Sequence, residues 1–302
     1  MIPIIFSTDH NYIVPTGVAI TSLLTNSTDE TYEINILISD NVTDEDKNQL
    51  KEVVASSSSG IKFKNSGNIF DNAYETRGIT KATYFRLLIP WIFPEYNKVI
   101  YCDGDVIFRR GLNDLYNEDI ENFYVGGVLD FYDDKLFIKY LNEIGLNWDY
   151  YINAGVLLIN SNLWRINKLD EAIKKHLYTK YEYQDQDIIN ILCRDKIKYL
   201  SPVYNFNSNK YCTFMSGKES PTDRYNVNME ELIKNIHIIH YCGLKPWNTM
   251  SQFLSGDWYA YYALSVFYSP GKEYKKYYDI IFPSWYDVIK LFYRRIKKAI
   301  QK

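Results

Sequence analysis

The sequence predicts an α/β fold with a mainly parallel central sheet, and two observations lead to that prediction. Over the first 110 residues, short apolar runs alternate with helical patterns every few tens of residues, as expected where crossover helices join parallel strands. The 302 residues are 46% hydrophobic, which is enough to fill the core of one large domain. We expect that domain to span residues 1–265 and a helical tail to follow over residues 266–302.

The first strand is predicted over Ile4–Phe6. It ends in the polar stretch Ser7–Tyr12, which precedes a helix beginning near Pro15. A polar loop at the carboxyl end of a strand is where open α/β sheets bind nucleotides. The loop lacks the GxGxxG spacing, so we do not expect a dinucleotide site. Asp9 and Asn11 either hydrogen-bond a uracil or ribose there or are ordinary turn residues.

Two further strands are predicted in this half, over Glu33–Ser39 and Ile61–Phe63. The helix between them opens at Thr43, with Asp46 three residues later as its capping-box partner. The pattern of strand, helix and strand is what predicts parallel pairing.

A helix is next predicted over Thr80–Ile89, where Pro90 should end it. This helix contains Arg86. The arginine is either a solvated surface residue or, if it faces a cleft, a planar fork suited to a carboxylate or phosphate.

Two carboxylates interrupt the apolar stretch Lys98–Arg109. Asp103 and Asp105 flank Gly104 between two β-forming runs. Two ionised carboxylates between buried strands repel each other and lose hydration unless a cation lies between them. Mn²⁺ or Mg²⁺ would supply that charge, because both prefer carboxylate oxygens. Asp-Gly is also the commonest two-residue hairpin turn, so these residues alone leave a turn and a metal site equally open.

The second half continues with strands predicted over Tyr124–Leu129 and Val156–Asn160, and then a helix over Ser161–Tyr181. An aromatic-rich insert separates the two strands, and residues 202–227 are irregular and rich in Asn, Tyr, Ser and Pro. We expect both irregular segments to be loops that shape the acceptor side.

Polar residues stand beside the elements of this half. Asn153 belongs to a small Asn-Ala-Gly entry before a buried strand. Asp185, Gln186 and Asp187 begin a helical run that includes Ile188–Leu192. Acidic residues at a helix start are often only caps, and that is our interpretation for at least one of the two aspartates.

A last strand over Ile236–Ile239 ends at His240, just before the turn at Gly243. A lone histidine at such a junction is usually structural, but beside a carboxylate pair it is a candidate third metal ligand. Lys245 is either a surface lysine or a counter-charge for a diphosphate.

The net charge of −3 is unevenly distributed, because six basic residues follow the last acid, Asp287. On a helix, the apolar residues between Trp285 and Ile300 would lie opposite the basic ones. We interpret this segment as an amphipathic helix on an anionic membrane surface. The alternative is a helix packed on the domain with a solvated basic face. We expect no nucleic-acid partner.

The four cysteines contain no CxxC pair, and no secretory leader precedes them. No stretch is long and apolar enough to span a bilayer. We therefore expect reduced thiols and a cytoplasmic location, at the inner face of the membrane through the basic tail.

In this order, these stretches resemble the glycosyltransferase family 8 enzymes, the retaining hexosyltransferases that include bacterial lipopolysaccharide galactosyl- and glucosyltransferases and glycogenin. The resemblance covers about residues 2–250. It is carried by Phe6–Tyr12, Tyr84–Arg86, Asp103–Asp105, Asn153–Gly155, Gln184–Asp187 and His240–Trp247. The joint order of these motifs favours the metal site over the hairpin.

The resemblance implies a GT-A fold, a single Rossmann-like domain that binds a UDP-sugar and Mn²⁺, with Mg²⁺ as the alternative ion. It implies a nucleotide-binding half to about residue 110 and an acceptor half over residues 111–265. The implied metal ligands are Asp103, Asp105 and His240. The implied substrate contacts are Asp9 and Asn11 to the uridine, Gly243 and Lys245 to the diphosphate, and Arg86 and Asn153 to the donor sugar. The implied catalytic residues are Asp185 and Gln186, with Gln186 nearest the anomeric carbon.

The implied reaction moves glucose or galactose from UDP to a hydroxyl of a glycan acceptor, for a bacterial cell-surface polysaccharide or lipopolysaccharide. A divalent ion and Lys245 would stabilise the charge that develops on the β-phosphate. Retention could use Asp185 as a nucleophile, although the family pattern favours front-face attack by the acceptor hydroxyl.

Two other functions are weighed against this one. A nucleotidyltransferase acting on sugar phosphates would carry a glycine-rich basic loop near the first strand, and Ser7–Tyr12 has none. A non-catalytic carbohydrate-binding protein with a degenerate site is the other, and the presence of every implied ligand argues against it.

Overall fold

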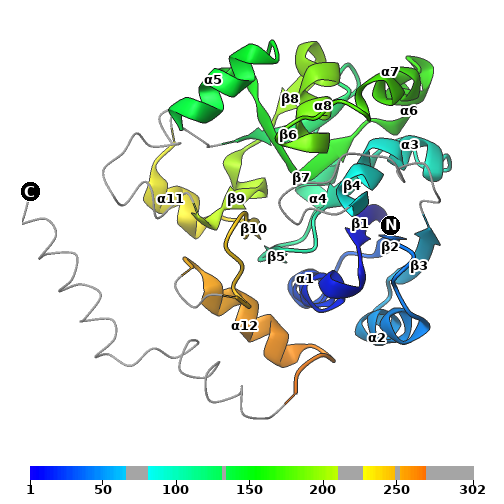
Figure 1. The fold of residues 1–302 in the computed structure, drawn as a ribbon. Helices are drawn as coiled ribbons and strands as arrows, with labels where there is room; N and C mark the ends of the chain where they lie inside the picture. Colours follow the sequence, from blue (N-terminus) through cyan, green and yellow to red (C-terminus); the bar gives the residue numbers. More distant parts are fainter. Residues whose placement is uncertain (66–80, 131–133, 210–226, 249–251, 270–302) are drawn as a thin grey trace, which may run out of the picture.

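A seven-stranded sheet forms the centre of the computed structural model (Figure 1). The structure describes residues 1–65, 81–130, 134–209, 227–248 and 252–269. The strand order is β3-β2-β1-β4-β7-β6-β8. The strands are β1 (Ile2–Thr8), β2 (Tyr32–Ile38), β3 (Gly60–Asn65), β4 (Val99–Cys102), β6 (Val125–Leu129), β7 (Ile152–Ile159) and β8 (Ile197–Tyr199). Four neighbouring pairs are parallel, and β7 runs antiparallel to β4 and β6. The prediction of a mainly parallel sheet is confirmed.

A second, three-stranded sheet lies beside the first and has the order β5-β10-β9. Its strands are β5 (Val106–Phe108), β9 (Phe206–Asn207) and β10 (Ile238–His240). Strand β10 is antiparallel to β5 and parallel to β9. This small sheet joins β5, just after the Asp103–Asp105 stretch, to β10, which is more than 100 residues later in the sequence.

Helices cover both faces of the large sheet (Figure 1). The α-helices are α1 (Ile13–Asn26), α2 (Asp44–Val54), α3 (Ile89–Ile92), α4 (Asn113–Asn117), α5 (Lys135–Glu143), α6 (Ser161–Ile166), α7 (Leu169–His176), α8 (Gln184–Cys193), α11 (Met229–Lys234) and α12 (Ser255–Leu264). The 3-10 helices are η1 (His10–Tyr12), η3 (Lys81–Leu88), η4 (Trp148–Tyr150), η5 (Arg194–Lys196) and η6 (Pro202–Tyr204).

The alternation of side chains along β1 explains the two helical layers. Ile4 and Phe6 are fully buried in a cluster with residues of α1 and α2. Ile5 points to the other face, into a cluster with residues of η3, α3, α6, α7 and α8. Because successive side chains of a strand leave opposite faces, an all-apolar strand requires a layer of helices on each side.

Two helix predictions need correction. Residues 81–88 form the 3-10 helix η3, and Pro90 lies in the first turn of α3 instead of ending a helix. In a first turn the missing N–H of proline removes no helical hydrogen bond. The helix predicted over 161–181 is two helices, α6 and α7, because Lys168 has a φ of +52° at the break. The Thr43–Asp46 capping box is confirmed.

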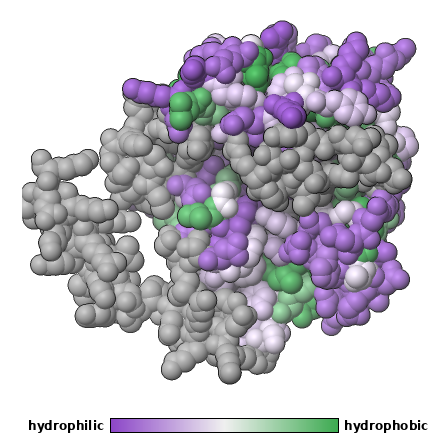
Figure 2. All heavy atoms as spheres, in the orientation of Figure 1, coloured by the Kyte–Doolittle hydropathy of each residue, from purple (hydrophilic) through white to green (hydrophobic). Residues whose placement is uncertain are grey.

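The surface agrees with this layered core. Figure 2 shows hydrophilic residues over the helices at the top and lower right of that view, with apolar residues in small separate patches. In the part of the chain that the structure describes, no helix has the length and apolar character needed to cross a bilayer. The predicted amphipathic tail lies outside the described residues.

Candidate active site

The Asp103-Gly104-Asp105 stretch connects the two sheets and is not a hairpin turn. Strand β4, which precedes it, pairs with β1 and β7, whereas β5, which follows it, pairs with β10. The backbone N–H of Asp103 donates to the carbonyl of Gly155 in β7 at 2.8 Å. A Cβ on Gly104 would lie 2.4 Å from Oγ1 of Thr16 in α1, so the crossing requires glycine. The structure therefore excludes the hairpin alternative.

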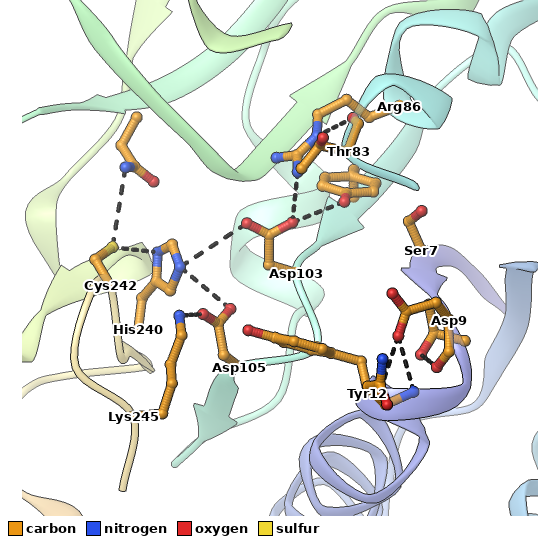
Figure 3. Close-up of a pocket in the computed structure, with 15 residues that line it drawn as sticks. Ser7, Asp9, Tyr12, Thr83, Arg86, Asp103, Asp105, His240, Cys242 and Lys245 are labelled. Carbon is orange, nitrogen blue, oxygen red and sulfur yellow. Dashed lines mark hydrogen bonds and ion pairs between the residues drawn. The ribbon is translucent and has the colours of Figure 1, made fainter. Parts of the chain in front are cut away.

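The register of the small sheet brings His240 to the two aspartates. His240 of β10 pairs with Val106 of β5, and Tyr241 N–H donates to the carbonyl of Asp105 at 3.0 Å. The His240 Nε2 atom lies 3.3 Å from Oδ1 of Asp105 and 3.9 Å from Oδ2 of Asp103. One ligand atom of each of these three residues lies within 4.8 Å of the others. Figure 3 shows the three side chains directed toward one another.

The residues present fit a divalent cation. Asp105 is 5% exposed, and its buried Oδ1 accepts no hydrogen bond within the described part of the chain. A buried carboxylate oxygen without a hydrogen-bond donor is costly unless a cation faces it. Two carboxylates and one imidazole form a mixed oxygen and nitrogen donor set, which suits a divalent metal ion.

The charges around this cluster shift the pKa values of its members. Burial raises the pKa of Asp105, but Lys245 and His240 lower it by more, so the pKa lies well below its usual range. Burial lowers the pKa of His240, whereas the Cys242 sulfur and the Asp105 carboxylate raise it by more, and the net direction is upward. In the metal-free protein both shifts favour the charged forms of Asp105 and His240.

A cavity of about 470 Å³ opens onto the cluster at the carboxyl ends of β1 and β4. It is lined by eight of the residues predicted from the sequence, namely Asp9, Asn11, Arg86, Asp103, Asp105, Asn153, His240 and Lys245. Asp9 also caps η1, because its Oδ1 accepts hydrogen bonds from the N–H groups of Asn11 and Tyr12. Asp9 is thus a turn residue whose position also borders the cavity.

Arg86 is buried and joins two carboxylates, so it is not a solvated surface arginine. Its Nη2 lies 2.8 Å from Oδ1 of Asp103, and its Nε lies 2.9 Å from Oδ2 of Asp185. Its Nη1 donates to the carbonyl of Ala154 at 2.5 Å. The guanidinium also stacks 4.5 Å from the ring centre of Tyr101, whose hydroxyl donates to Asp103. Burial raises the pKa of Asp185 to about 7, although Arg86 opposes the shift.

The start of α8 lies behind the cavity wall. Gln186 accepts from Ala154 N–H through Oε1 and donates through Nε2 to Asp130, each at 3.0 Å. Asp187 accepts from the hydroxyls of Tyr140 and Tyr151 at 2.6 Å and anchors the helix start. Asp187 also accepts from Tyr183 N–H, just before α8, at 2.9 Å, which agrees with the interpretation of at least one of the two aspartates as a cap. Asp185 and Gln186 do not line the cavity itself. Asp185 contacts Arg86, which does, whereas Gln186 contacts Ala154 and Asp130, which do not.

Two residues near the site, Gln184 and Gly243, have a positive φ. Gln184, the first residue of α8, has a φ of +46°, which is uncommon outside glycine. Gly243 has a φ of +74°, and a Cβ there would lie 2.7 Å from Nδ2 of Asn209. Gly243 is not among the residues that line the cavity. Lys245, two residues on, bonds the Asp105 carboxylate and donates to the carbonyl of Tyr241.

Sequence reasoning did not select Asp130, Asn205 or Cys242. Asp130 follows the buried strand β6 just as Asp103 follows β4, so the same pattern could have identified it. Asn205 is 2% exposed and lies 2.8 Å from Nδ1 of His240. It belongs to an irregular segment with no periodicity, and the sequence held no signal for it.

The fold and the cluster together define a class, the glycosyltransferases of GT-A fold. The model of the glycosyl transferase family 8 matches residues 3–251, and the chain belongs to this family. A Haemophilus influenzae protein designated a glycosyltransferase is 32% identical over 250 residues, which cover 80% of this chain and 71% of that protein. The lipopolysaccharide 1,2-glucosyltransferase of Escherichia coli K12 is 25% identical over 276 residues, covering 89% of this chain and 78% of that enzyme.

Solved structures agree. The galactosyltransferase LgtC, in complex with donor and acceptor sugar analogs, is similar with a TM-score of 0.73 and 26% identity. The match covers 91% of this chain and 100% of that chain. The expected family and the expected GT-A fold are confirmed.

Proposed function

We propose that this glycosyltransferase transfers glucose or galactose from a UDP-sugar to a hydroxyl of a glycan acceptor, with retention of configuration, and uses Mn²⁺, with Mg²⁺ as the alternative. One observation carries the proposal: Asp103, Asp105 and His240 converge beside Lys245 in a cavity at the carboxyl ends of β1 and β4. LgtC, whose fold this chain shares, was solved with donor and acceptor sugar analogs.

Residues of the first 110 positions would hold the nucleotide, and residues 111–265 would form the acceptor half. Asp9 and Asn11 stand at the end of β1 and line the cavity, where they would contact the uridine. Asp103, Asp105 and His240 would hold the metal ion. That ion, when bound, would neutralise charge on the diphosphate and so make UDP a better leaving group.

Lys245 would add a second positive charge for the diphosphate. Its side chain is 17% exposed and lies in the same cavity as the three proposed metal ligands. A lysine ammonium is a compact charge that binds phosphate oxygens without a fixed geometry. The turn at Gly243, two residues before Lys245 and with a φ of +74°, would lie beside the same diphosphate.

The donor sugar would lie against Arg86 and Asn153, with Asp185 and Gln186 behind them. Oδ2 of Asp185 is engaged by Arg86, which lowers its value as a nucleophile. This arrangement favours attack by the acceptor hydroxyl on the face from which UDP leaves. The acceptor oxygen bonds to the anomeric carbon, the bond from that carbon to UDP breaks, and UDP keeps the electron pair. The hydroxyl proton passes to an oxygen of the departing phosphate.

The test measures release of UDP from UDP-glucose and UDP-galactose, with and without Mn²⁺. Other UDP-sugars are assayed in the same way, to show which sugar the enzyme accepts. The proposal predicts metal-dependent release of UDP. A nucleotidyltransferase would instead react UTP with a sugar phosphate and release pyrophosphate from the UTP. A non-catalytic binding protein would release neither UDP nor pyrophosphate.

We further propose a role in cell-surface glycan synthesis at the inner face of the cytoplasmic membrane. The support is the similarity to an Escherichia coli lipopolysaccharide glucosyltransferase and the basic, amphipathic sequence of residues 285–302. Removal of residues 285–302 should release the protein from anionic liposomes and leave UDP-sugar hydrolysis unchanged. Unchanged liposome binding would contradict the membrane proposal.

A further inference from the structure

The two nitrogens of His240 face different surroundings. Nε2 faces the carboxylates of Asp103 and Asp105 at 3.9 and 3.3 Å. Nδ1 lies 2.8 Å from Oδ1 of Asn205. A neutral imidazole can bind a cation only through the nitrogen that carries no proton, and the group beside the other nitrogen decides which one that is.

The orientation of the neighbouring amide of Asn153 is fixed from outside. The backbone N–H of Gly155 donates to Oδ1 of Asn153 at 3.0 Å, and Nδ2 of Asn153 donates to the carboxylate of Asp130 at 3.2 Å. A backbone N–H can only donate, so the atom that it contacts must be the amide oxygen. The Asn153 side chain therefore cannot be rotated by half a turn without placing an N–H against an N–H.

This polarity continues through Asn205. Nδ2 of Asn205 donates to Oδ1 of Asn153 at 2.9 Å, so the oxygen of Asn205 is the atom that faces His240. An amide oxygen can only accept, and the proton of a neutral His240 must therefore be on Nδ1. Cys242 Sγ, 3.1 Å from the same nitrogen, is a weak acceptor and is compatible with this assignment. Asn205 and His240 are both nearly inaccessible to solvent, at 2% and 4% exposure.

We propose that Asn205 is a positioning residue that holds His240 as the Nδ1–H tautomer, so that the lone pair of Nε2 points at Asp103 and Asp105. The role in metal binding rests on the proposed metal-dependent function. The assignment of the tautomer rests on the chain of hydrogen bonds from Gly155 through Asn153 to Asn205. These hydrogen bonds also link the donor-sugar side of the cavity, at Asn153, to the metal side.

The first experiment uses the nitrogen chemical shifts of the histidine side chains in the metal-free full chain, at alkaline pH where the imidazoles are neutral. The chain has four histidines, and a His240→Gln variant assigns the signal. The proposal predicts a protonated Nδ1 and an unprotonated Nε2 in the wild type. A protonated Nε2 would overturn the proposal without any variant of Asn205.

The second experiment removes the acceptor. Asn205→Leu keeps the side-chain size but offers no oxygen to Nδ1, whereas Asn205→Asp keeps an oxygen there. Asn35→Leu is the matched control, since Asn35 is another buried asparagine, 1% exposed, whose side chain bonds Glu33 and Tyr96 in and near β2. The probe is Mn²⁺ alone, titrated into each folded protein without any UDP-sugar.

We expect Asn205→Leu to weaken Mn²⁺ binding about 10- to 100-fold, as loss of an outer-shell partner of a metal-bound histidine does. Its His240 signal should shift toward the Nε2–H form, while Asn205→Asp retains the wild-type tautomer and Asn35→Leu changes neither readout. Wild-type Mn²⁺ affinity in folded Asn205→Leu would overturn the proposal. If the wild type shows the Nδ1–H form but binds no Mn²⁺, the tautomer assignment stands and the proposed function fails.

Discussion

Gly155 lies against the imidazole of His240 so closely that no side chain fits between them. A Cβ on Gly155 would lie 2.1 Å from Cε1 and 2.8 Å from Nδ1 of His240. The carbonyl of Gly155 also accepts the hydrogen bond from Asp103 N–H at 2.8 Å. One glycine of β7 thus contacts two of the three proposed metal ligands, which explains the glycine of the Asn-Ala-Gly stretch.

Substitution of Gly155 by alanine should displace the imidazole of His240. We expect Mn²⁺ affinity to fall about 10- to 100-fold, because the ring cannot keep both its contact with Asn205 and its approach to Asp105. Isothermal titration with Mn²⁺ measures the effect. Gly126→Ala is the control, since a Cβ there would meet a flexible side-chain atom of Leu200 at 3.2 Å. Equal Mn²⁺ affinity for Gly155→Ala and wild type would show that His240 is not a ligand.

Arg86→Lys tests whether the guanidinium fork matters beyond its charge. Arg86 bonds Asp103 and Asp185 through different nitrogens, and a single ammonium cannot hold both carboxylates in place. We expect turnover of the UDP-sugar to fall about 10²-fold, as for a misplaced catalytic group. Arg109→Lys is the matched control, since Arg109 makes a two-point bond to Asp257 away from the cavity. Turnover equal to that of the control would contradict the assigned role.

Asp185 should make stability depend on pH. Burial raises its folded-state pKa to about 7, whereas an unfolded aspartate titrates at about 3.9. The folded protein therefore holds an extra proton between these values, and the associated stability is full below about pH 4 and is lost as pH rises through about 7.

The matching experiment compares thermal unfolding of the wild type and Asp185→Asn in chelator across this pH range. The asparagine cannot ionise and keeps an oxygen for Arg86. The wild type should lose about 2.7 kcal/mol between pH 5 and pH 8, so the melting temperature of Asp185→Asn should rise relative to the wild type by about 5–10 °C, at about 2–4 °C per kcal/mol. Asp119→Asn, at an exposed position, is the control. A constant difference between Asp185→Asn and wild type across the range would show that Asp185 is ionised throughout.

Lys245→Met distinguishes a role of Lys245 in diphosphate binding from a role in binding the metal ion. The ammonium of Lys245 bonds Asp105 and should not assist cation binding there, since like charges repel. We expect Mn²⁺ affinity in the absence of donor to stay the same or rise, and turnover of the UDP-sugar to fall about 10²- to 10³-fold because a donor to the leaving group is lost. Unchanged turnover would remove Lys245 from the reaction. Lys234→Met, on exposed α11, is the control.

Much of the sheet could be predicted because burial on both faces requires uninterrupted apolar strands. The Ile4–Phe6 run of β1, the Ile36–Ile38 run of β2 and the whole of β4 are such segments, and they differ from their surroundings in the sequence itself. The 3-10 geometry of η3 and the break at Lys168 could not be predicted, because both depend on packing of the finished fold and not on a local pattern.

The candidate site, too, could be predicted only in part from the sequence. Asp103 and Asp105 stood out because charge is unfavourable between buried strands, and the order of motifs related them to His240. Asn205 gave no such signal: its importance comes from a hydrogen bond to His240 across 35 positions of sequence. A residue that hydrogen-bonds a proposed metal ligand in this way can be identified only once the pairing of the strands is known.

The central claim is that Asp103, Asp105 and His240 together hold the divalent cation used in sugar transfer. Its most direct test is the rate of UDP release from UDP-glucose and UDP-galactose by the wild type and by Asp103→Asn at saturating Mn²⁺. The claim predicts metal-dependent release by the wild type that chelation abolishes, and no measurable release by the folded variant. Near-normal release by Asp103→Asn would contradict it.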